Sequence, residues 1–183
     1  REPISDVANV LSGYVDCIVA RISNHNLISE LAEHASVPVI NALSDVEHPC
    51  QAMADLLTIY EHKDALERLS LTFVGDGNNV ARSLCLAAPA VGMNFTSASP
   101  QGYNLDEALL EKARSRANRS SVQVRTMTSP QEAVVGADVV YTDVWASMGQ
   151  EAEAKARQAA FAGYTVNPEL MRQANDGALF MHD

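Results

Sequence analysis

The sequence predicts an α/β fold: a doubly wound parallel sheet of five strands with helices on both faces, preceded by the tail of a second α/β domain. Short apolar runs alternate with longer segments of helical periodicity along most of the chain. Continuous apolar strands are typical of parallel sheets that are covered on both faces. The 183 residues, 47% of them hydrophobic, suffice for a buried core.

The first 45 or so residues predict a fragment of a domain. The expected elements are a helix over 4–14, a strand over 17–20, a helix over 27–35 and a strand over 37–40. Two strands do not form an independent sheet, so we expect the beginning of this domain to be missing. A helix over 51–63 follows and could bridge two domains, and the expected domain ranges are 1–50 and 51–183.

The rest of the chain alternates regularly. Strands are predicted at 70–74, 93–97, 121–126, 138–142 and 178–182, with helices over 79–91, 105–118, 130–135, 150–160 and 168–175. Ser129 and Glu132 form a capping box, and Asn104 and Glu107 are expected to form another. Pro89 lies inside a predicted helix, which we therefore expect to end early or to kink.

Composition excludes several classes of protein. A net charge of −10 disfavours nucleic acid as a partner, because such a surface repels phosphate backbones. No apolar run approaches the ~20 residues that cross a bilayer, so no membrane partner is expected. The three cysteines are odd in number and form no CxxC pair, which disfavours a zinc site or disulfides and favours the cytoplasm. Cys17 and Cys85 are predicted to be buried.

Ligands of parallel sheets bind beyond the carboxyl ends of the strands, which directs attention to the loops there. Gly75-Asp-Gly77-Asn-Asn79 follows a predicted strand and opens a helix, where a backbone can approach an anion. Val80 replaces the third glycine of a dinucleotide fingerprint, and no acidic residue follows ~20 positions later, so a nicotinamide cofactor is disfavoured. The alternative is a tight turn with an asparagine helix cap.

Two further loops contain residues suited to chemistry. In His48-Pro-Cys-Gln51 the histidine precedes a helix, from whose start His48 and Gln51 could contact one ligand; the alternative is a surface histidine. In Asp143-Val-Trp-Ala-Ser-Met-Gly-Gln150 an acid follows a buried strand and suits an ammonium group; the alternative is a capped loop with a tryptophan packing anchor. The helical run Glu151–Arg157 is predicted to be a solvated face.

In their order along the chain, these segments resemble the ornithine carbamoyltransferases of the aspartate/ornithine carbamoyltransferase family. The resemblance also includes Val-Ala-Arg21 and Pro-Val-Ile-Asn-Ala-Leu-Ser-Asp45. It implies that one domain binds carbamoyl phosphate and the other binds L-ornithine, without a metal or organic cofactor, in a homotrimer. By match of motif, Arg21 and His48 would be catalytic, whereas the substrate-binding residues would be Gln51, Asn79, Asp143, Ser147 and Met148.

The chain departs from the family pattern in two places. The family's Ser-Thr-Arg-Thr phosphate loop is absent, and Asp183 stands where the His-Cys-Leu-Pro motif beginning at His182 requires cysteine. We therefore expect an incomplete chain that is inactive alone. The alternatives are a carbamoyltransferase for another amine (aspartate, putrescine or an acylated ornithine) and a non-catalytic domain that binds an amino acid or forms trimers.

Overall fold

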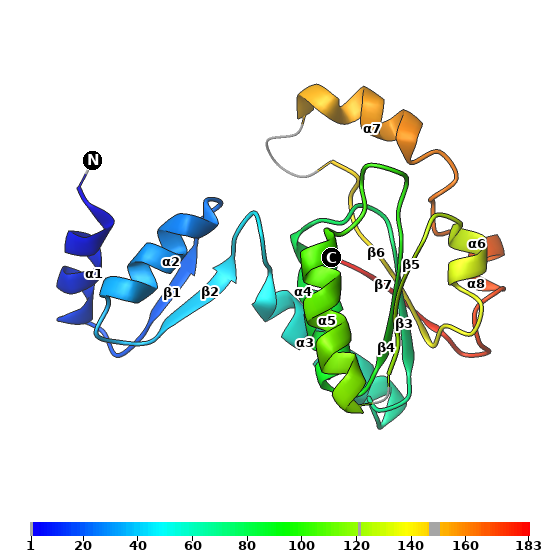
Figure 1. Cartoon of the computed structure of the whole chain (residues 1–183), viewed down its shortest axis with the longest axis horizontal. Coiled ribbons are helices and arrows are strands. Elements are labelled where there is room, and N and C mark those ends of the chain that lie inside the picture. The colour runs from blue at the N-terminus through cyan, green and yellow to red at the C-terminus, as the bar shows by residue number, and fades with distance from the viewer. Residues whose placement is uncertain (1, 121, 147–150) are drawn as a thin grey trace.

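The computed structural model describes residues 2–120, 122–146 and 151–183 and contains two parallel sheets. The first unit consists of α1 (Ile4–Ser12), β1 (Ile18–Arg21), α2 (His25–His34) and β2 (Val39–Leu43), and it lies to one side of the larger sheet in Figure 1. Its core is small and comprises Ala8, Ile18, Ala20, Ile28 and Leu31. Alternate strand residues point outward, and Val19 is 61% exposed.

Helix α3 (Pro49–Lys63) connects the two units. Pro49 occupies the first helical position, where its missing N–H costs nothing. The helix packs against β2 and against α4 (Asn79–Ala90), so it contacts both units as expected of a bridge. Its buried residues Ala52, Leu56 and Ile59 belong to the core of the larger unit.

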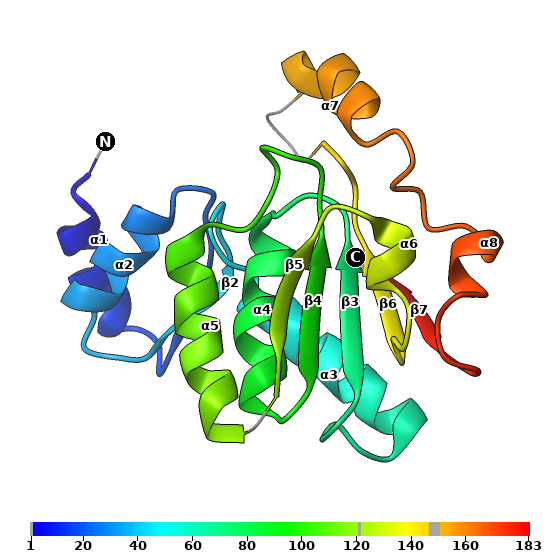
Figure 2. The ribbon, with the colours of Figure 1, turned by 45° about the vertical axis from the view of Figure 1, so that its right-hand side comes forward.

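The larger unit contains five strands, as predicted. They are β3 (Ser70–Val74), β4 (Asn94–Ala98), β5 (Val124–Met127), β6 (Val139–Thr142) and β7 (Leu179–His182). All pair in parallel, in the order β5-β4-β3-β6-β7 (Figure 2). The chain first adds strands on one side of β3 and then returns to add them on the other. The carboxyl ends of β3 and β6 therefore form the switch point where α/β sheets bind ligands.

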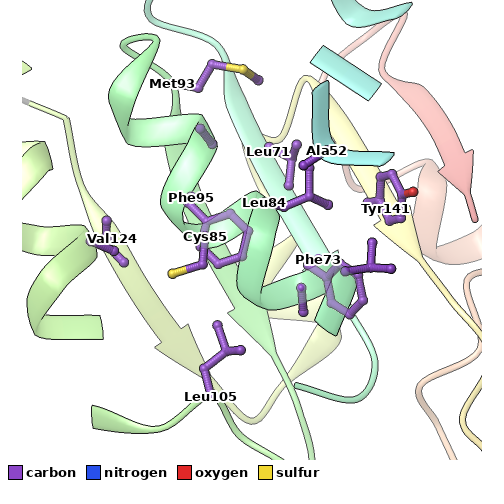
Figure 3. Close-up of a cluster of buried hydrophobic side chains, with 14 of the residues drawn as sticks. Ala52, Leu71, Phe73, Leu84, Cys85, Met93, Phe95, Leu105, Val124 and Tyr141 are labelled. Atoms are coloured by element: carbon purple, nitrogen blue, oxygen red, sulfur yellow. The ribbon is translucent and has the colours of Figure 1, made fainter. Parts of the chain in front are cut away.

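Helices cover both faces of this sheet, which confirms the predicted fold class. Figure 1 shows α3, α4 and α5 (Glu107–Ser120) on one side and α6 (Pro130–Ala133) and α8 (Pro168–Met171) on the other. The 3₁₀ turn η1 (Glu151–Glu153) leads into α7 (Ala154–Ala160). In the core beneath α3 and α4, the rings of Phe73 and Tyr141 stack with centroids 5.7 Å apart (Figure 3). Across the described residues, no helix has the length and apolarity to cross a membrane.

Three local predictions are corrected. Helix α5 is capped by Asp106, whose carboxylate accepts from the Leu109 N–H at 2.9 Å, and not by Asn104. Cys17 is exposed because it directly precedes β1 and has the same parity as Val19, whose face of the strand is uncovered, whereas Cys85 is buried as predicted. Helix α4 does not end before Pro89 but continues to Ala90, so the proline lies in the last helical turn.

Candidate active site

A cavity of about 820 Å³ lies between the two units. Its walls come from the carboxyl ends of β1 and β2 in the first unit and from the loops that follow β3, β4 and β6 in the second. Four of the predicted site residues line it, namely Arg21, His48, Asn79 and Asp143. Gln51 lies in the first turn of α3 and is not part of the lining. Ser147 and Met148 fall outside the described residues.

Arg21 owes its position to an irregularity in the small sheet. The pairing of β1 with β2 shifts between Ala20 and Arg21, so that Arg21 lies opposite Leu43 and not opposite Ala42. Such a bulge bends the strand and re-aims the side chain at its end. The guanidinium group of Arg21 thereby becomes part of the cavity wall.

The loop between β2 and α3 is folded around the buried hydroxyl group of Ser44. This oxygen accepts from the Glu47 N–H at 3.0 Å and lies 2.8 Å from Nδ1 of His25. The Ser44 carbonyl in turn accepts from Nδ2 of Asn79 at 2.8 Å. A predicted substrate-binding residue of the second unit is therefore hydrogen-bonded directly to the first.

His48 stands at the amino end of α3. Its backbone N–H donates to Oγ of Ser83 at 2.9 Å, which ties the loop to α4. Burial lowers the pKa of the His48 imidazole and Arg21 lowers it further, while Asp183 and Asp143 oppose the shift. The ring is therefore neutral near pH 7. Its Nδ1 atom is buried and has no hydrogen-bond partner among the described residues.

The Gly75–Asn79 turn packs tightly against the loop after β4. The Gly77 N–H donates to the Tyr103 carbonyl at 2.8 Å, and a Cβ atom at position 77 would lie 2.8 Å from backbone atoms of Asn104 and Leu105. Asn78 caps α4 by accepting from the Ala81 N–H at 3.0 Å. The alternative interpretation, a tight turn with an asparagine cap, therefore describes the geometry correctly and is compatible with a ligand-binding role for Asn79.

Asp143 is held by its neighbours at the end of β6. One carboxylate oxygen accepts from Nδ2 of Asn78 at 2.6 Å, and the other accepts from the Val144 N–H at 2.6 Å. Burial raises the pKa of Asp143, and these two hydrogen bonds oppose that shift. Asn78 was not among the predicted site residues. Its position beside Asn79 at a strand end is the sequence signal that could have identified it.

Arg157 contradicts the prediction of a solvated face over Glu151–Arg157. It is only 7% exposed, and it donates to Asp76 at 2.6 Å, to the Trp145 carbonyl at 3.1 Å and to Glu153 at 3.1 Å. Its guanidinium carbon lies 5.1 Å from the centre of the Tyr103 ring. The physical reason is the half-buried Asp76, which needs a counter-charge that helical periodicity cannot reveal. Arg157 thereby fastens α7 to the loops after β3, β4 and β6.

Three arginines line the cavity together with five acidic residues, Asp45, Asp76, Asp143, Glu153 and Asp183. The arginines are Arg21, Arg82 and Arg157; Arg82 is ion-paired with Asp106, and Arg157 is ion-paired with Asp76 and Glu153. Nε of Arg82 is buried without a hydrogen-bond partner among the described residues. No ion pair of Arg21 occurs among the described residues, so its guanidinium group can attract a small anion even though the chain carries a net charge of −10.

The tryptophan of the loop after β6 is a packing anchor, as the alternative interpretation supposed. The rings of Trp145 and Phe161 are stacked, with centroids 5.7 Å apart. The anchor holds one end of the loop against the face of the sheet opposite α4. Within the parts of the chain that the structure describes, no group of three or more His, Cys, Asp or Glu residues could hold a metal ion.

Comparison with known proteins identifies relatives of both units. Residues 1–61 match the family model of the aspartate/ornithine carbamoyltransferase carbamoyl-P binding domain, and residues 67–183 match that of the Asp/Orn binding domain. Among curated proteins, the ornithine carbamoyltransferases of Anoxybacillus flavithermus and Methanobrevibacter smithii are 52% and 51% identical over 181 residues. These alignments cover 99% of this chain but 58% and 60% of the relatives.

Solved structures agree with the sequence matches. The ornithine carbamoyltransferase from Pyrococcus furiosus superposes with a TM-score of 0.95 at 48% identity, covering 99% of this chain and 58% of that one. The enzyme from Gloeobacter violaceus gives 0.91 at 42% identity and covers 100% and 61%. The family models, the sequence identity and the shared fold all agree: the chain belongs to the aspartate/ornithine carbamoyltransferase family.

Proposed function

We propose that the complete gene product containing residues 1–183 transfers the carbamoyl group of carbamoyl phosphate to the side-chain amine of L-ornithine, giving L-citrulline and phosphate. The chain itself spans about 58% of the length of the Anoxybacillus flavithermus relative. The observation that supports the proposed activity is one cavity lined by Arg21 and His48 from the first unit and by Asn79 and Asp143 from the second.

The first unit suits the carbamoyl donor, and we assign residues 1–50 to that role. Arg21 offers a permanent cation and His48 a neutral imidazole beside it, in a wall to which Arg82 also contributes. As the amine attacks the carbonyl carbon, negative charge develops on the carbonyl oxygen. Arg21 and His48 would stabilise that charge as donors that are already in place, and losing one such donor typically costs about 3–4 kcal/mol. Gln51 would hold the carbamoyl amide.

The second unit, residues 51–183, suits the amino-acid end of ornithine. Asp143 offers a carboxylate for the α-ammonium group, and Asn79 offers amide groups nearby. Ser147 and Met148 would complete this set. Fixing the amino-acid end aims the distal amine, in its neutral form, at the carbonyl carbon, which is a proximity effect. A tetrahedral intermediate then collapses with loss of phosphate, and we propose no metal or organic cofactor.

The same carboxylate argues against aspartate as the acceptor. Aspartate must bind through two carboxylates, but no Lys or Arg lies between Thr142 and Gln150 to receive one of them. Like charges ~4 Å apart cost about 4 kcal/mol at an effective dielectric constant of 20. Putrescine has no amino-acid end and would leave the polar groups around Asn79 unpaired, which usually causes strong rejection.

The test is a comparison of kcat/KM for ornithine, aspartate and putrescine in the complete gene product. Ornithine should be preferred by at least about 100-fold, and Asp143→Asn should raise the ornithine KM by roughly 10-fold to 100-fold. Comparable rates with aspartate, or an Asp143→Asn variant that keeps full ornithine affinity, would show that the role of the loop is misassigned. A polypeptide of residues 1–183 alone should form no citrulline, because it lacks the Ser-Thr-Arg-Thr loop.

We further propose a homotrimer in the cytoplasm that serves arginine metabolism and binds neither nucleic acid nor membranes. The family resemblance supports the trimer and the role in arginine metabolism. The cysteine pattern supports the cytoplasm, the net charge of −10 disfavours nucleic acid, and no apolar run of the sequence approaches the ~20 residues that cross a bilayer. Light scattering of the complete gene product would test the assembly state directly. Calorimetry with each substrate would separate an enzyme from a module that binds only an amino acid.

A further inference from the structure

A buried carboxylate behind the cavity has no role in the reaction proposed above. Asp55 lies on α3 among Ala52, Leu56 and Ile59 and is only 5% exposed. No ion pair involving it occurs among the described residues. Burial raises its pKa to about 6, so it remains largely ionised at neutral pH. A charge in this position is costly to the fold, which raises the question of what it does.

Within the described parts of the chain, Asp55 has one hydrogen bond of ordinary geometry, and its partner is Gln51. Nε2 of Gln51 donates to Oδ1 of Asp55 at 3.0 Å, across one turn of α3. The two ends of a glutamine amide look alike in shape, so its orientation depends on its partners. An ionised carboxylate can only accept, so the end of the amide that faces Asp55 must be the NH₂ group. The carbonyl oxygen of Gln51 is then the end left for another partner.

Tyr141 of β6 adds a second constraint on Asp55. The other carboxylate oxygen and the Tyr141 hydroxyl group are both buried and lack a hydrogen bond of ordinary geometry among the described residues. They are nevertheless close enough to interact. Burial is the main cause that raises the pKa of the Tyr141 phenol, and Asp55 raises it further. In turn, Tyr141 offsets part of the rise in the pKa of Asp55. The carboxylate is therefore held between Gln51 and a strand of the sheet, and it cannot turn away from Gln51 without losing both neighbours.

We propose that Asp55 is a positioning residue that fixes the Gln51 amide with its oxygen toward the carbamoyl nitrogen, and so selects a carbamoyl donor over an acyl donor. The inference rests on the function proposed above. Carbamoyl phosphate differs from acetyl phosphate by an NH₂ group in place of a methyl group. An oxygen at that position accepts from NH₂ and gains nothing from a methyl group, whereas a rotated amide would present NH₂ to NH₂.

Asp55→Asn in the complete gene product tests this role. Asparagine keeps the shape but can present either oxygen or NH₂ to Gln51, so the orientation of the glutamine amide is no longer fixed. We expect kcat/KM for carbamoyl phosphate to fall about 10-fold to 100-fold, as for other small losses of alignment, with the ornithine KM changed less than about 2-fold. The Ki of acetyl phosphate should not change, so discrimination between the two donors should shrink by the same factor.

A double-mutant cycle distinguishes positioning from general damage. In a Gln51→Met background, Asp55→Asn should have less than about a 2-fold further effect, because its only route to the donor has been removed. If the effects of the two substitutions on kcat/KM for carbamoyl phosphate multiply, the two residues act independently and the proposal is overturned. Glu61→Gln, on an exposed part of the same helix, is the matched control and should leave every constant unchanged.

Folding and the proposed function can be checked separately. Removing a buried charge should leave Tm equal or higher, and a large fall in Tm with both KM values raised would indicate a structural role and overturn the proposal. If Asp55→Asn does not fold, Gln51→Met alone must reduce donor discrimination, and unchanged discrimination would refute the idea. A wild-type protein that forms no citrulline refutes the proposed function itself, whereas an active wild type with a normal Asp55→Asn variant refutes only this inference.

Discussion

The two units are built from the same sequence pattern and reach different degrees of burial. In the five-stranded unit, the central strand β3 is covered by helices on both faces, and Phe73 is 0% exposed. In the two-stranded unit, five small or medium side chains form the core, and Val19 and Ile40 point outward from adjacent strands. An apolar strand therefore does not reveal whether one or both of its faces are covered. The proposed site takes its catalytic groups from the less buried unit.

The largest expected effect compares one strand residue from each unit. Phe73→Ala should lower the free energy of unfolding by about 3–5 kcal/mol, because it leaves a cavity beside Tyr141. Val19→Ala should change it by less than about 0.5 kcal/mol, because the side chain is already exposed. Urea unfolding of both variants measures the difference. Equal losses would mean that the outer face of β1 is covered in solution.

The next prediction compares the kinetic effects of replacing one proposed site residue from each unit. His48→Ala should lower kcat by roughly 100-fold to 1,000-fold with little change in the ornithine KM, because the charge it stabilises develops in the transition state. Asn79→Ala should instead raise the ornithine KM, because Asn79 belongs to the amino-acid side. Steady-state kinetics of the complete gene product separates the two. Unchanged turnover with a raised ornithine KM in His48→Ala would contradict the assignment.

A third test uses pH and concerns only the larger unit. The pKa of Asp55 is raised from 3.8 to about 6 by burial, so the folded state binds this proton more tightly than the unfolded state. The contribution of protonated Asp55 to stability is fully present below about pH 3.8 and is lost as the pH rises to about 6. The free energy of unfolding that is lost over this pH range amounts to about 3 kcal/mol.

The measurement is urea unfolding between about pH 4 and pH 7.5 for wild type and Asp55→Asn. The stability difference between the two should grow in favour of the variant as the pH rises through that window. Other titrating groups are common to both proteins and cancel in the comparison. A difference that does not depend on pH would mean that Asp55 is ordinarily solvated in the folded state.

The smallest effect needs no substitution. Amide hydrogen exchange should be faster in β1 and β2 than in β3 and β4 by at least about tenfold, or roughly 1.4 kcal/mol of opening free energy. The reason is the small core behind the two-stranded sheet. Strong protection across residues 2–45 in a monomer would show that this unit is as stable as the larger one.

Periodicity and motif order predicted the fold class, the five strands and four residues of the cavity wall. These features depend on local patterns that the chain repeats. Arg157 and Cys17 were wrongly placed for a different reason. Arg157 is buried by its distant partner Asp76, and Cys17 is exposed because one face of β1 is not covered. Long-range charge pairing and the covering of a strand face leave little trace in a short window of sequence.

Asn78 illustrates the limit for the site itself. The motif identified the turn but not which of two adjacent asparagines would contact Asp143 and which would contact Ser44. That division depends on the start of α4, where Asn78 becomes the cap and Asn79 becomes the first helical residue. The strand order was likewise not predicted, because sequence alternation alone does not determine where the chain reverses.

The close approach at Gly77 has a consequence for protein engineering. Replacing glycine with alanine is a standard way to stiffen a loop and gain stability. At position 77 the added methyl group would meet the backbone of Asn104 and Leu105 at 2.8 Å, and a backbone cannot move aside as a flexible side chain can. The displaced segment begins at Tyr103, whose ring lies against Arg157. A library built to rigidify this protein should therefore leave position 77 unvaried, even though no side chain there marks it as important.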